Sequence, residues 1–408
     1  MNIQVPISKS IYNRILILKA LFPDQLKHTA IQTELPSDCR VLQKNLTDWS
    51  LNKEGIFNAQ DAGTAFRFLT AFFACSNRTQ ILTGTNRMKA RPIKGLVKAL
   101  NDMGASISYM EKDGYPPLRI GDFKQKSDCI AIDASKSSQF ISALLLIAPS
   151  LKKGLSLRLK GDKVSRSYVS LTLTILKQLD INLSAIKDKI IVNPLKELSA
   201  LPISIENDWS SIGYWYNWCL STDKSIRIGQ VKPYSIQGDS VLAKEFSCFG
   251  ITSTFQNNNL YLESNNTAVN GAIISINCIS TPDLFLTFVC SSLLTKKKII
   301  LSGLNTLADK ESNRIEVAKD LLIALNVSYS FEENQLEIEE FPVSYPKCLI
   351  INSIDDHRVV LSFSALKPLI PGLRFDNTEV VKKSYPNYWV EVEKINQQLN
   401  LKLSTFNL

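Results

Sequence analysis

The chain has 408 residues, which exceeds the length at which one hydrophobic core usually stops growing, so two domains are expected. Apolar residues make up 45% of it, and the longest apolar run, 143–148, is far shorter than the roughly 20 residues that span a bilayer. The first residues resemble neither a signal peptide nor a transit peptide. We therefore expect a cytoplasmic protein that binds no membrane.

Cysteine and histidine patterns argue against a metal centre. The eight cysteines are widely scattered and never form a CxxC pair, so they indicate neither a zinc site nor a disulfide framework. The chain has only two histidines, His28 and His357, which leaves few ligands for a histidine-based metal site. We predict reduced thiols, no bound metal and no other cofactor.

The formal net charge of +9 is compatible with nucleic acid, an anionic membrane or small anionic substrates as partners. The lysine runs at 152–153 and 296–298 stand next to turns and lack the interleaved aromatic residues of a surface on which bases stack. We interpret these runs as solvated turn charges. No nucleic-acid partner is predicted, and the binding cations are expected among the other basic residues.

One sequence pattern occurs six times along the chain. Each copy opens with small or polar residues that lead into a strongly apolar helix, and a second, amphipathic helix follows. The opening positions, spaced by roughly 53, 75, 73, 72 and 74 residues, are Ser10, Gly63, Ser138, Ser211, Asp283 and His357. The second helices are predicted at 36–49, 91–104, 165–179, 237–250, 312–326 and 386–399, and strand-like runs such as 155–159 and 299–301 lie between helices.

Six repeats of two helices plus several strands predict an α/β protein with two similar domains of three repeats each. A boundary near 200–210, where Leu201-Pro202 precedes the fourth repeat, separates an N-terminal domain at 8–205 from a C-terminal domain at 1–7 plus 206–408. The first helix of each repeat is apolar on nearly all sides, so it is predicted to be buried. If these helix starts converge, their unpaired N–H groups would attract anions.

Seven motifs along this repeat resemble the signatures of 5-enolpyruvylshikimate-3-phosphate synthases. In chain order they are SKSIYNR at 8–14 for SKSxxNR, DAGTAFR at 61–67 for NAGTAxR, RMKARPI at 87–93 for RMKxRPI, SSQF at 137–140, KESNR at 310–314 for KExxR, DHR at 356–358 and KSYPNY at 383–388 for KTFPDY. The resemblance covers nearly the whole chain. It implies the inside-out α/β barrel of that family, an active site in the cleft between two domains, and a monomer.

The family transfers the enolpyruvyl group of phosphoenolpyruvate to the 5-hydroxyl of shikimate 3-phosphate. Two phosphates and two carboxylates share the site, so several cations are required. By resemblance Asp283 is the base for the hydroxyl, Glu311 is the proton donor and Lys9 is a third catalytic residue. The resemblance implies that shikimate 3-phosphate is bound by Lys9, Ser10, Arg14, Ser137, Ser138, Gln139, Ser165, Tyr168, Asp283 and Lys310. It implies that phosphoenolpyruvate is bound by Lys9, Gly63, Arg91, Gln139, Arg314, Arg358 and Lys383.

Several of these positions have a structural alternative. Asp283 and Asp208 both stand at predicted helix starts and could be N-caps. Arg67 could support its own loop, and His357 could be a packed histidine beside Arg358. The sequence also departs from the family pattern, with Asp61 for Asn, Phe68 for Pro, Ile7 for Gly and Asn313 for Asp, and with Thr306 aligned to a family Asn. The chain starts about a dozen residues later than is usual, so the first crossover strand is expected to be incomplete.

Three other functions were weighed. The enolpyruvyl transferase that acts on UDP-N-acetylglucosamine shares the fold but works with a loop cysteine, and the loop after Arg87 has none before Arg91. RNA 3′-terminal phosphate cyclases have a similar repeated architecture and need a histidine near the C-terminus, but His357 is explained by the DHR motif. A non-catalytic protein derived from the synthase is the third, and retention of Lys9, Asp283, Glu311 and Lys383 argues against it.

Overall fold

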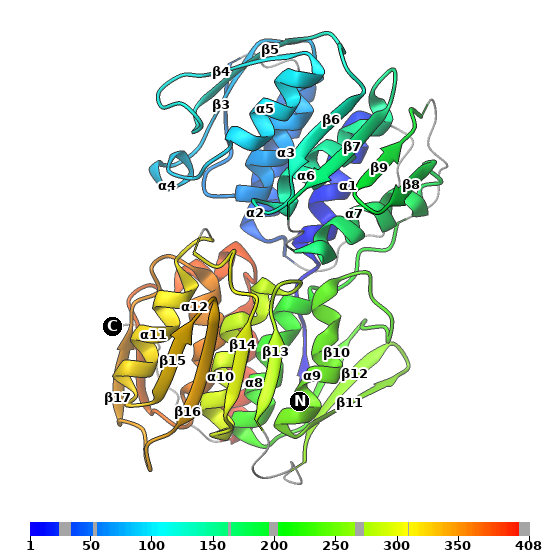
Figure 1. Cartoon of the computed structure of the whole chain (residues 1–408). Coiled ribbons are helices and arrows are strands. Elements are labelled where there is room, and N and C mark those ends of the chain that lie inside the picture. The colour runs from blue at the N-terminus through cyan, green and yellow to red at the C-terminus, as the bar shows by residue number, and fades with distance from the viewer. Residues whose placement is uncertain are drawn as a thin grey trace. The chain divides into compact units, whose positions relative to one another are not determined.

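The computed structural model describes residues 1–23, 34–51, 55–161, 165–195, 203–265, 273–308 and 310–399. His28 and the dipeptide at 201–202 lie outside these ranges. The chain divides into two compact units, an N-terminal unit of residues 8–205 and a C-terminal unit of residues 1–7 and 206–408 (Figure 1). Each unit is described by itself below.

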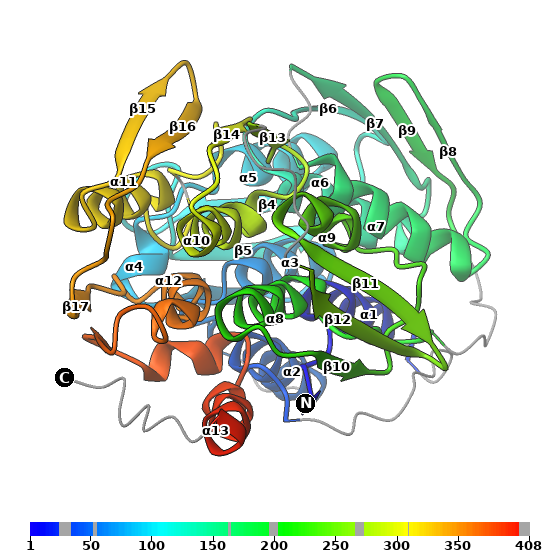
Figure 2. The same cartoon turned by 90° about the horizontal axis from the view of Figure 1, so that it is seen from below.

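Three apolar helices lie at the centre of each unit. In the N-terminal unit they are α1 (Lys9–Leu21), α3 (Gly63–Ala74) and α6 (Ser138–Ile147), which pack against one another. In the C-terminal unit they are α8 (Trp209–Thr222), α10 (Phe285–Thr295) and α12 (His357–Phe363), which lie side by side in Figure 2. Most residues of these helices are buried, because apolar side chains occupy most sides of each helix. The predicted burial of the first helices is confirmed. No helix in the described ranges is both long and apolar enough to cross a bilayer.

The second helix of each repeat covers this centre in five of the six cases. These helices are α2 (Ser37–Ser50), α5 (Lys94–Met103), α7 (Arg166–Gln178), α11 (Arg314–Ala324) and α13 (Tyr388–Leu399), as predicted within a few residues. They contact neighbouring helices or strands of their own unit, and most of their solvent-facing residues are polar, with Ile323 of α11 and Val390 of α13 as large apolar exceptions. A further short helix, α4 (Asn86–Lys89), precedes α5.

The continuous helix predicted at 237–250 is wrong. A single turn of helix, α9 (Leu242–Glu245), stands between 3-10 turns at Gly238–Val241 and Phe246–Phe249. The hydroxyls of Ser240 and Ser247 donate to the carbonyls three residues earlier, which favours the tighter 3-10 spacing. Leu242, Phe246 and Phe249 of this segment are still buried, so the pattern identified its buried face but not its regularity.

Four sheets share one strand order, in which a parallel pair is extended by an antiparallel hairpin. The first sheet of the N-terminal unit has the order β2 (Ile56–Asn58), β3 (Gln80–Thr83), β5 (Leu118–Phe123), β4 (Ala105–Tyr109). Its second sheet has the order β6 (Cys129–Asp133), β7 (Leu155–Lys160), β9 (Lys189–Val192), β8 (Leu183–Ile186). The first sheet of the C-terminal unit has the order β1 (Asn2–Ile3), β10 (Ile226–Gly229), β12 (Asn259–Ser264), β11 (Ile251–Gln256). Its second sheet has the order β13 (Ile274–Asn277), β14 (Ile299–Ser302), β16 (Gln335–Glu340), β15 (Ser328–Glu332). Strands β17 (Cys348–Ile351) and β18 (Gly372–Phe375) form a separate parallel pair.

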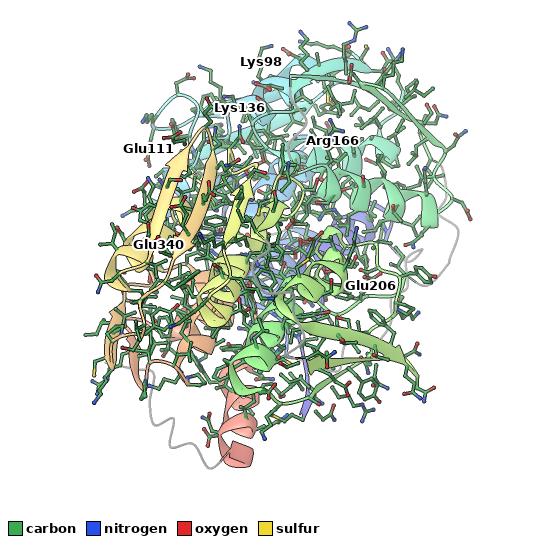
Figure 3. All side chains as sticks on the ribbon, turned by 60° about the horizontal axis from the view of Figure 1, so that its bottom comes forward. Lys98, Glu111, Lys136, Arg166, Glu206 and Glu340 are labelled. Atoms are coloured by element: carbon green, nitrogen blue, oxygen red, sulfur yellow. The ribbon has the colours of Figure 1, made fainter. Side chains whose placement is uncertain are left out.

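Five of the six first helices, α3, α6, α8, α10 and α12, lie along the chain between two parallel strands that pair with each other, as in a βαβ unit. The strands before and after α1, β1 and β2, belong to different sheets. The fold is therefore mixed α/β with helices inside and sheets outside, and none of the described sheets closes into a barrel. Charged side chains such as Lys98, Glu111 and Glu340 are exposed on the outside (Figure 3). Buried charges in this protein are thus exceptions that require a partner.

Strand β1 belongs to the C-terminal unit although it opens the chain. Asn2 and Ile3 pair in parallel with Arg227 and Ile228 of β10, and Ile7 forms a bridge with Asn207. The N-terminal unit is therefore inserted between β1 and the helix α8 that follows it in the repeat. A two-residue strand is short, but Ile3 is fully buried in the core of the C-terminal unit.

Candidate active site

The first turns of four helices lie together in the N-terminal unit. Gln139, in the first turn of α6, donates from Nε2 to Thr64 Oγ1 at the start of α3 at 3.1 Å. Arg14, one turn into α1, donates to the carbonyls of Ser10 at 2.6 Å and of Tyr168, in the first turn of α7, at 3.1 Å. Helix N-termini carry partial positive charge, so this end of the unit favours anions.

Arg14 fixes three of these helices to one another. Its guanidinium is 2% exposed, and besides the two carbonyls it donates to Thr172 Oγ1 at 2.8 Å and Ser142 Oγ at 3.1 Å. Burial lowers the pKa of Arg14 to about 9. The structural partners Thr172 and Ser142 were not predicted, because they follow Arg14 by 158 and 128 residues and neither lies in a motif position. The predicted contact of Arg14 with shikimate 3-phosphate stays a prediction.

Gly63 is surrounded by arginine side chains. A β-carbon at this position would lie 2.6 Å from Arg91 Nη1 and 2.7 Å from Arg67 Nη1, so only glycine leaves room for both guanidinium groups. Arg67 donates to the Gly63 carbonyl at 2.9 Å and lies 5.8 Å from the ring centroid of Phe140. Arg67 thus supports its own loop, the alternative weighed for it. Arg91 Nε is buried and has no hydrogen-bond partner among the described residues.

Lys9 pairs with a carboxylate that the motifs did not identify. Its Nζ lies 3.3 Å from Asp38 Oδ2 at the start of α2, and both side chains are largely buried. The side chain of Ser8 does not cap α1, and its hydroxyl has no partner in the described part of the chain. The N-cap residue of α1 therefore supplies no side-chain cap, and the Lys9 cation lies beside this helix start. The only sequence signal for Asp38 was its place at the predicted helix start.

The serines of the SSQF motif and the start of α7 differ in their local roles. Ser137 caps α6 by accepting from the Gln139 N–H at 3.3 Å, and Ser138 is buried. Ser165 is buried at the N-cap of α7 in a left-handed conformation (φ 49°) and makes no side-chain cap. A non-glycine residue in this conformation is uncommon and marks a constrained position.

In the C-terminal unit, Arg314 is held by three carboxylates. Its Nη1 lies 2.8 Å from Asp283 Oδ1, its Nη2 lies 2.9 Å from Glu311 Oε2, and its Nε lies 3.0 Å from Asp356 Oδ2. Burial acts to lower the pKa of Arg314, but the carboxylates of Asp356, Asp283 and Glu311 outweigh it and raise the pKa above its usual value. Arg314 is thus a permanent cation that orients both predicted catalytic carboxylates.

The carboxylate of Asp283 is clamped between two guanidinium groups. Arg358 Nη2 lies 2.9 Å from its Oδ2, opposite the contact with Arg314, and Lys310 Nζ lies 3.9 Å from Oδ1. Asp283 stands inside the 3-10 turn Pro282–Leu284 before α10. Asp208, by contrast, is an N-cap that accepts from the Ser211 N–H at 2.9 Å. Asp208 is thus the N-cap that its structural alternative predicts, whereas the role of Asp283 as the base stays a prediction.

Lysines complete this cluster. Lys383 Nζ lies 3.9 Å from Glu311 Oε1, so Glu311 has a cation on each side. Burial lowers the pKa of Lys310 despite the neighbouring Asp283.

His357 is buried, with Nδ1 3.7 Å from the Asp356 carboxylate, as the packed alternative predicts. In the described ranges no group of three or more His, Cys, Asp or Glu side chains has the arrangement of a metal site.

Three of the departures from the family motifs, Asp61, Phe68 and Asn313, have structural partners. Asp61 accepts a hydrogen bond from the hydroxyl of Thr85, the N-cap of α4, which ties the Gly63 loop to the segment before Arg91. Phe68 is buried, with its ring centroid 5.4 Å from the Arg14 guanidinium carbon. Asn313 caps α11 by accepting from the Glu316 N–H.

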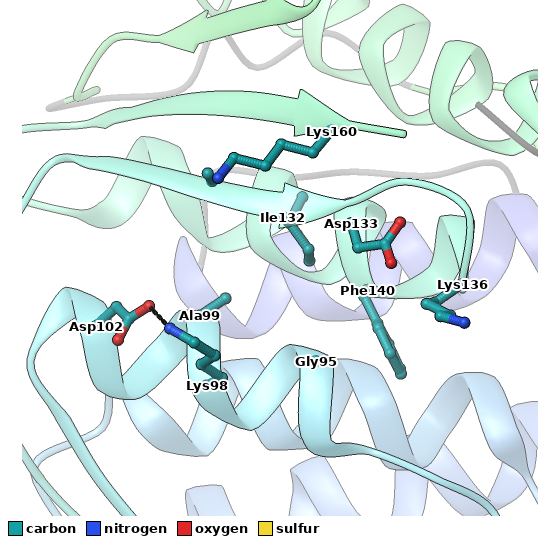
Figure 4. Close-up of a pocket in the computed structure, with 10 residues that line it drawn as sticks. Gly95, Lys98, Ala99, Asp102, Ile132, Asp133, Lys136, Phe140 and Lys160 are labelled. Carbon is teal, nitrogen blue, oxygen red and sulfur yellow. Dashed lines mark hydrogen bonds and ion pairs between the residues drawn. The ribbon is translucent and has the colours of Figure 1, made fainter. Parts of the chain in front are cut away.

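A separate pocket of about 440 Å³ lies in the N-terminal unit between α5, the β6–β7 pair and Phe140 (Figure 4). Three lysines and two aspartates line it, and Lys98 is paired with Asp102 at 2.7 Å. None of the predicted binding residues lines this pocket. We therefore do not assign it to the candidate site.

Comparison with known proteins gives one family. A family model described as EPSP synthase (3-phosphoshikimate 1-carboxyvinyltransferase) matches residues 24–392. A protein named 3-phosphoshikimate 1-carboxyvinyltransferase from Bacteroides fragilis (strain YCH46) is 36% identical over 398 residues, which cover 96% of this chain and 94% of that protein. One of the same name from Buchnera aphidicola subsp. Cinara cedri is 30% identical over 95% of this chain and 93% of that protein.

The fold is also that of solved structures. EPSP synthase from Acinetobacter baumannii, in a structure at 2.37 Å, superposes with a TM-score of 0.71 over 97% of this chain and 95% of that chain. Its sequence identity is 18%, so this similarity concerns the fold alone.

Proposed function

The chain belongs to the EPSP synthase (3-phosphoshikimate 1-carboxyvinyltransferase) family, and from this premise we propose which side chains carry out its reaction. The enzyme transfers the enolpyruvyl group of phosphoenolpyruvate to the 5-hydroxyl of shikimate 3-phosphate and releases phosphate, a step of the shikimate pathway. UDP-N-acetylglucosamine is not favoured as the acceptor, because relatives that match nearly the whole chain are named for 3-phosphoshikimate.

Asp283 is the base in this proposal, and its clamp by Arg314 and Arg358 is the observation that supports the assignment most directly. Two guanidinium groups at 2.8 and 2.9 Å stabilise the ionised carboxylate and fix its direction. An ionised, oriented carboxylate can accept the proton of the 5-hydroxyl as the hydroxyl oxygen bonds to C2 of phosphoenolpyruvate.

Glu311 is the acid. It gives a proton to the C3 methylene as the C–O bond forms, so that a tetrahedral intermediate with a methyl group results. Phosphate then leaves with its C–O electron pair, and Glu311 takes a proton back from the methyl group. The proton that Asp283 accepted from the 5-hydroxyl passes to the departing phosphate, so both carboxyl groups return to their starting states. The cations Lys383 and Arg314 beside Glu311 hold it in place and offset the charge of the leaving phosphate.

Lysine and arginine side chains bind the anionic substrates in this proposal. We assign to phosphoenolpyruvate the guanidinium groups of Arg91, Arg314 and Arg358 with Lys9, Gly63, Gln139 and Lys383. We assign to shikimate 3-phosphate the set Lys9, Ser10, Arg14, Ser137, Ser138, Gln139, Ser165, Tyr168, Asp283 and Lys310. The side-chain cations balance the substrate charge, so no metal is required. We further propose that the enzyme is a cytoplasmic monomer without a nucleic-acid partner.

The deciding assay measures phosphate release. The purified protein is mixed with phosphoenolpyruvate and either shikimate 3-phosphate or UDP-N-acetylglucosamine. We expect release with shikimate 3-phosphate alone. Release with UDP-N-acetylglucosamine instead would overturn the assignment, and binding of both substrates without release would identify a non-catalytic relative.

A further inference from the structure

Tyr214 lies against the clamp on Asp283 but belongs to none of the seven motifs. It stands in the second turn of α8, it is 1% exposed, and its hydroxyl accepts a hydrogen bond from Arg358 Nη1 at 3.1 Å. In the sequence it opens the apolar run 214–220, so it was predicted only as core. The ring packs edge-on against Tyr388 at a centroid distance of 6.5 Å.

The two terminal nitrogens of Arg358 have different partners. Nη2 makes the ion pair with Asp283 Oδ2 at 2.9 Å, and Nη1 meets the Tyr214 hydroxyl as well as the Asp283 carbonyl at 3.4 Å. A guanidinium group is planar, so holding Nη1 also fixes the direction of Nη2. The hydrogen bond to Tyr214 thereby restricts the rotation of the Arg358 guanidinium group where it contacts the Asp283 carboxylate.

We propose that Tyr214 is a positioning residue that acts through Arg358 to hold the Asp283 carboxylate in the orientation needed to accept the substrate proton. This inference rests on the proposed role of Asp283 as the base. Its effect is on the reacting geometry, because Arg358 contacts the carboxylate directly and Tyr214 contacts Arg358.

A tyrosine suits this place because its hydroxyl is a neutral acceptor. Burial raises the pKa of Tyr214 well above its ordinary value, so the phenol stays protonated across the working range. A carboxylate in the same place would compete with Asp283 for the charge of Arg358. The neutral hydroxyl satisfies one nitrogen of Arg358 and leaves the positive charge for Asp283.

The test compares two tyrosines on the same helix. Tyr216 is also buried on α8, but its hydroxyl bonds to Ser253 Oγ at 2.8 Å, outside the cluster. Tyr214→Phe and Tyr216→Phe therefore remove the same atom from two environments. We expect Tyr214→Phe to lower kcat roughly 10- to 100-fold, the usual effect of losing a hydrogen bond to a charged group, while Tyr216→Phe stays within about two-fold of wild type.

The pH profile separates positioning from a general structural effect. Loosening Arg358 weakens the stabilisation of ionised Asp283, so the acid limb of kcat should move up by about 0.5–1 pH unit in Tyr214→Phe. Charged groups that face Asp283 from the neighbouring elements are Arg314, Arg358, Lys310, Glu311 and Asp239. These groups are unchanged in both variants, so a shift seen only in Tyr214→Phe arises from the lost hydroxyl.

A double-mutant cycle covers the case in which Tyr214→Phe is destabilised. If Tyr214 acts through Arg358, then Tyr214→Phe should change kcat little in an Arg358→Lys background, which has no second nitrogen to hold. Additive losses, or equal losses in Tyr214→Phe and Tyr216→Phe, would overturn the inference. Absence of phosphate release by the wild-type protein would instead refute the proposed function.

Discussion

Gly63 and Arg91 lie so close together that a methyl group on residue 63 would not fit between them. A β-carbon on Gly63 would lie 2.6 Å from Arg91 Nη1. Arg91 and Arg67 are flexible side chains, so they can shift without disrupting α3, but they cannot keep their present positions. The size of the residue at position 63 therefore determines where the guanidinium groups of Arg67 and Arg91 can lie.

For Gly63→Ala we therefore expect the KM for phosphoenolpyruvate to rise roughly 10-fold or more, with a smaller change in kcat. Steady-state kinetics with varied phosphoenolpyruvate measure this. Gly121→Ala is the matched control in the same unit, because its β-carbon would meet its nearest neighbour, the Ser106 carbonyl, at 3.6 Å, an ordinary contact. Equal KM values for the two variants would contradict the assignment of the Gly63 loop to this substrate.

Replacing the proposed base by its amide isostere should lower kcat strongly and weaken substrate binding much less. Asp283→Asn keeps the shape but cannot accept the proton, so kcat should fall roughly 10²- to 10⁴-fold. Phosphate release measures kcat, and equilibrium binding of shikimate 3-phosphate measures affinity. Asp320→Asn, an exposed carboxylate on α11 of the same unit, is the control and should behave as wild type. Near-normal kcat in Asp283→Asn would exclude Asp283 as the base.

Asp239 should make stability depend on pH near neutrality. Burial raises the pKa of Asp239 to about 7, while its carboxylate also bonds to the Ser210 hydroxyl. The folded state therefore holds a proton that the unfolded state releases at its ordinary pKa, near 4. Stability should decline as the pH rises from about 4 to about 7 and level off above, by on the order of 1 kcal/mol or more.

Thermal unfolding midpoints at pH 5 and pH 8 measure this dependence. Asp239→Asn has no proton to lose, so the difference between its two midpoints should be smaller than in wild type. Asp223→Asn changes an exposed carboxylate at the end of α8 and should keep the wild-type difference. An unchanged difference in Asp239→Asn would mean that the carboxyl is ionised across this range.

Chelation should leave turnover intact. The anionic substrates are assigned to lysine and arginine side chains, which supply the positive charge that a metal would otherwise provide. Dialysis against EDTA followed by the phosphate-release assay measures this, with a metal-dependent phosphatase treated in parallel as a positive control for chelation. Loss of turnover that a divalent cation restores would refute the metal-free proposal.

Local pattern alone predicted much of the secondary structure. The central helices such as α3 and α6 are apolar on every side, and a helix of that kind must be buried whatever surrounds it. Five of the six second helices also follow from their amphipathic period, whereas 237–250 failed because serine hydroxyls compete for its carbonyls. The motifs identified the family, because they place particular residue types at particular spacings along the repeat.

Long-range partners could be decided only by the tertiary structure. The sequence could not show that Arg14 bonds to Thr172, that Lys9 pairs with Asp38, or that Tyr214 meets Arg358. It favoured catalysis for Asp283 and left capping open for Asp208, and the fold made Asp208 an N-cap and placed the Asp283 carboxylate between two guanidinium groups. The physical reason is that helix and strand periods depend on neighbouring residues, whereas the environment of a buried charge depends on which distant segments pack around it.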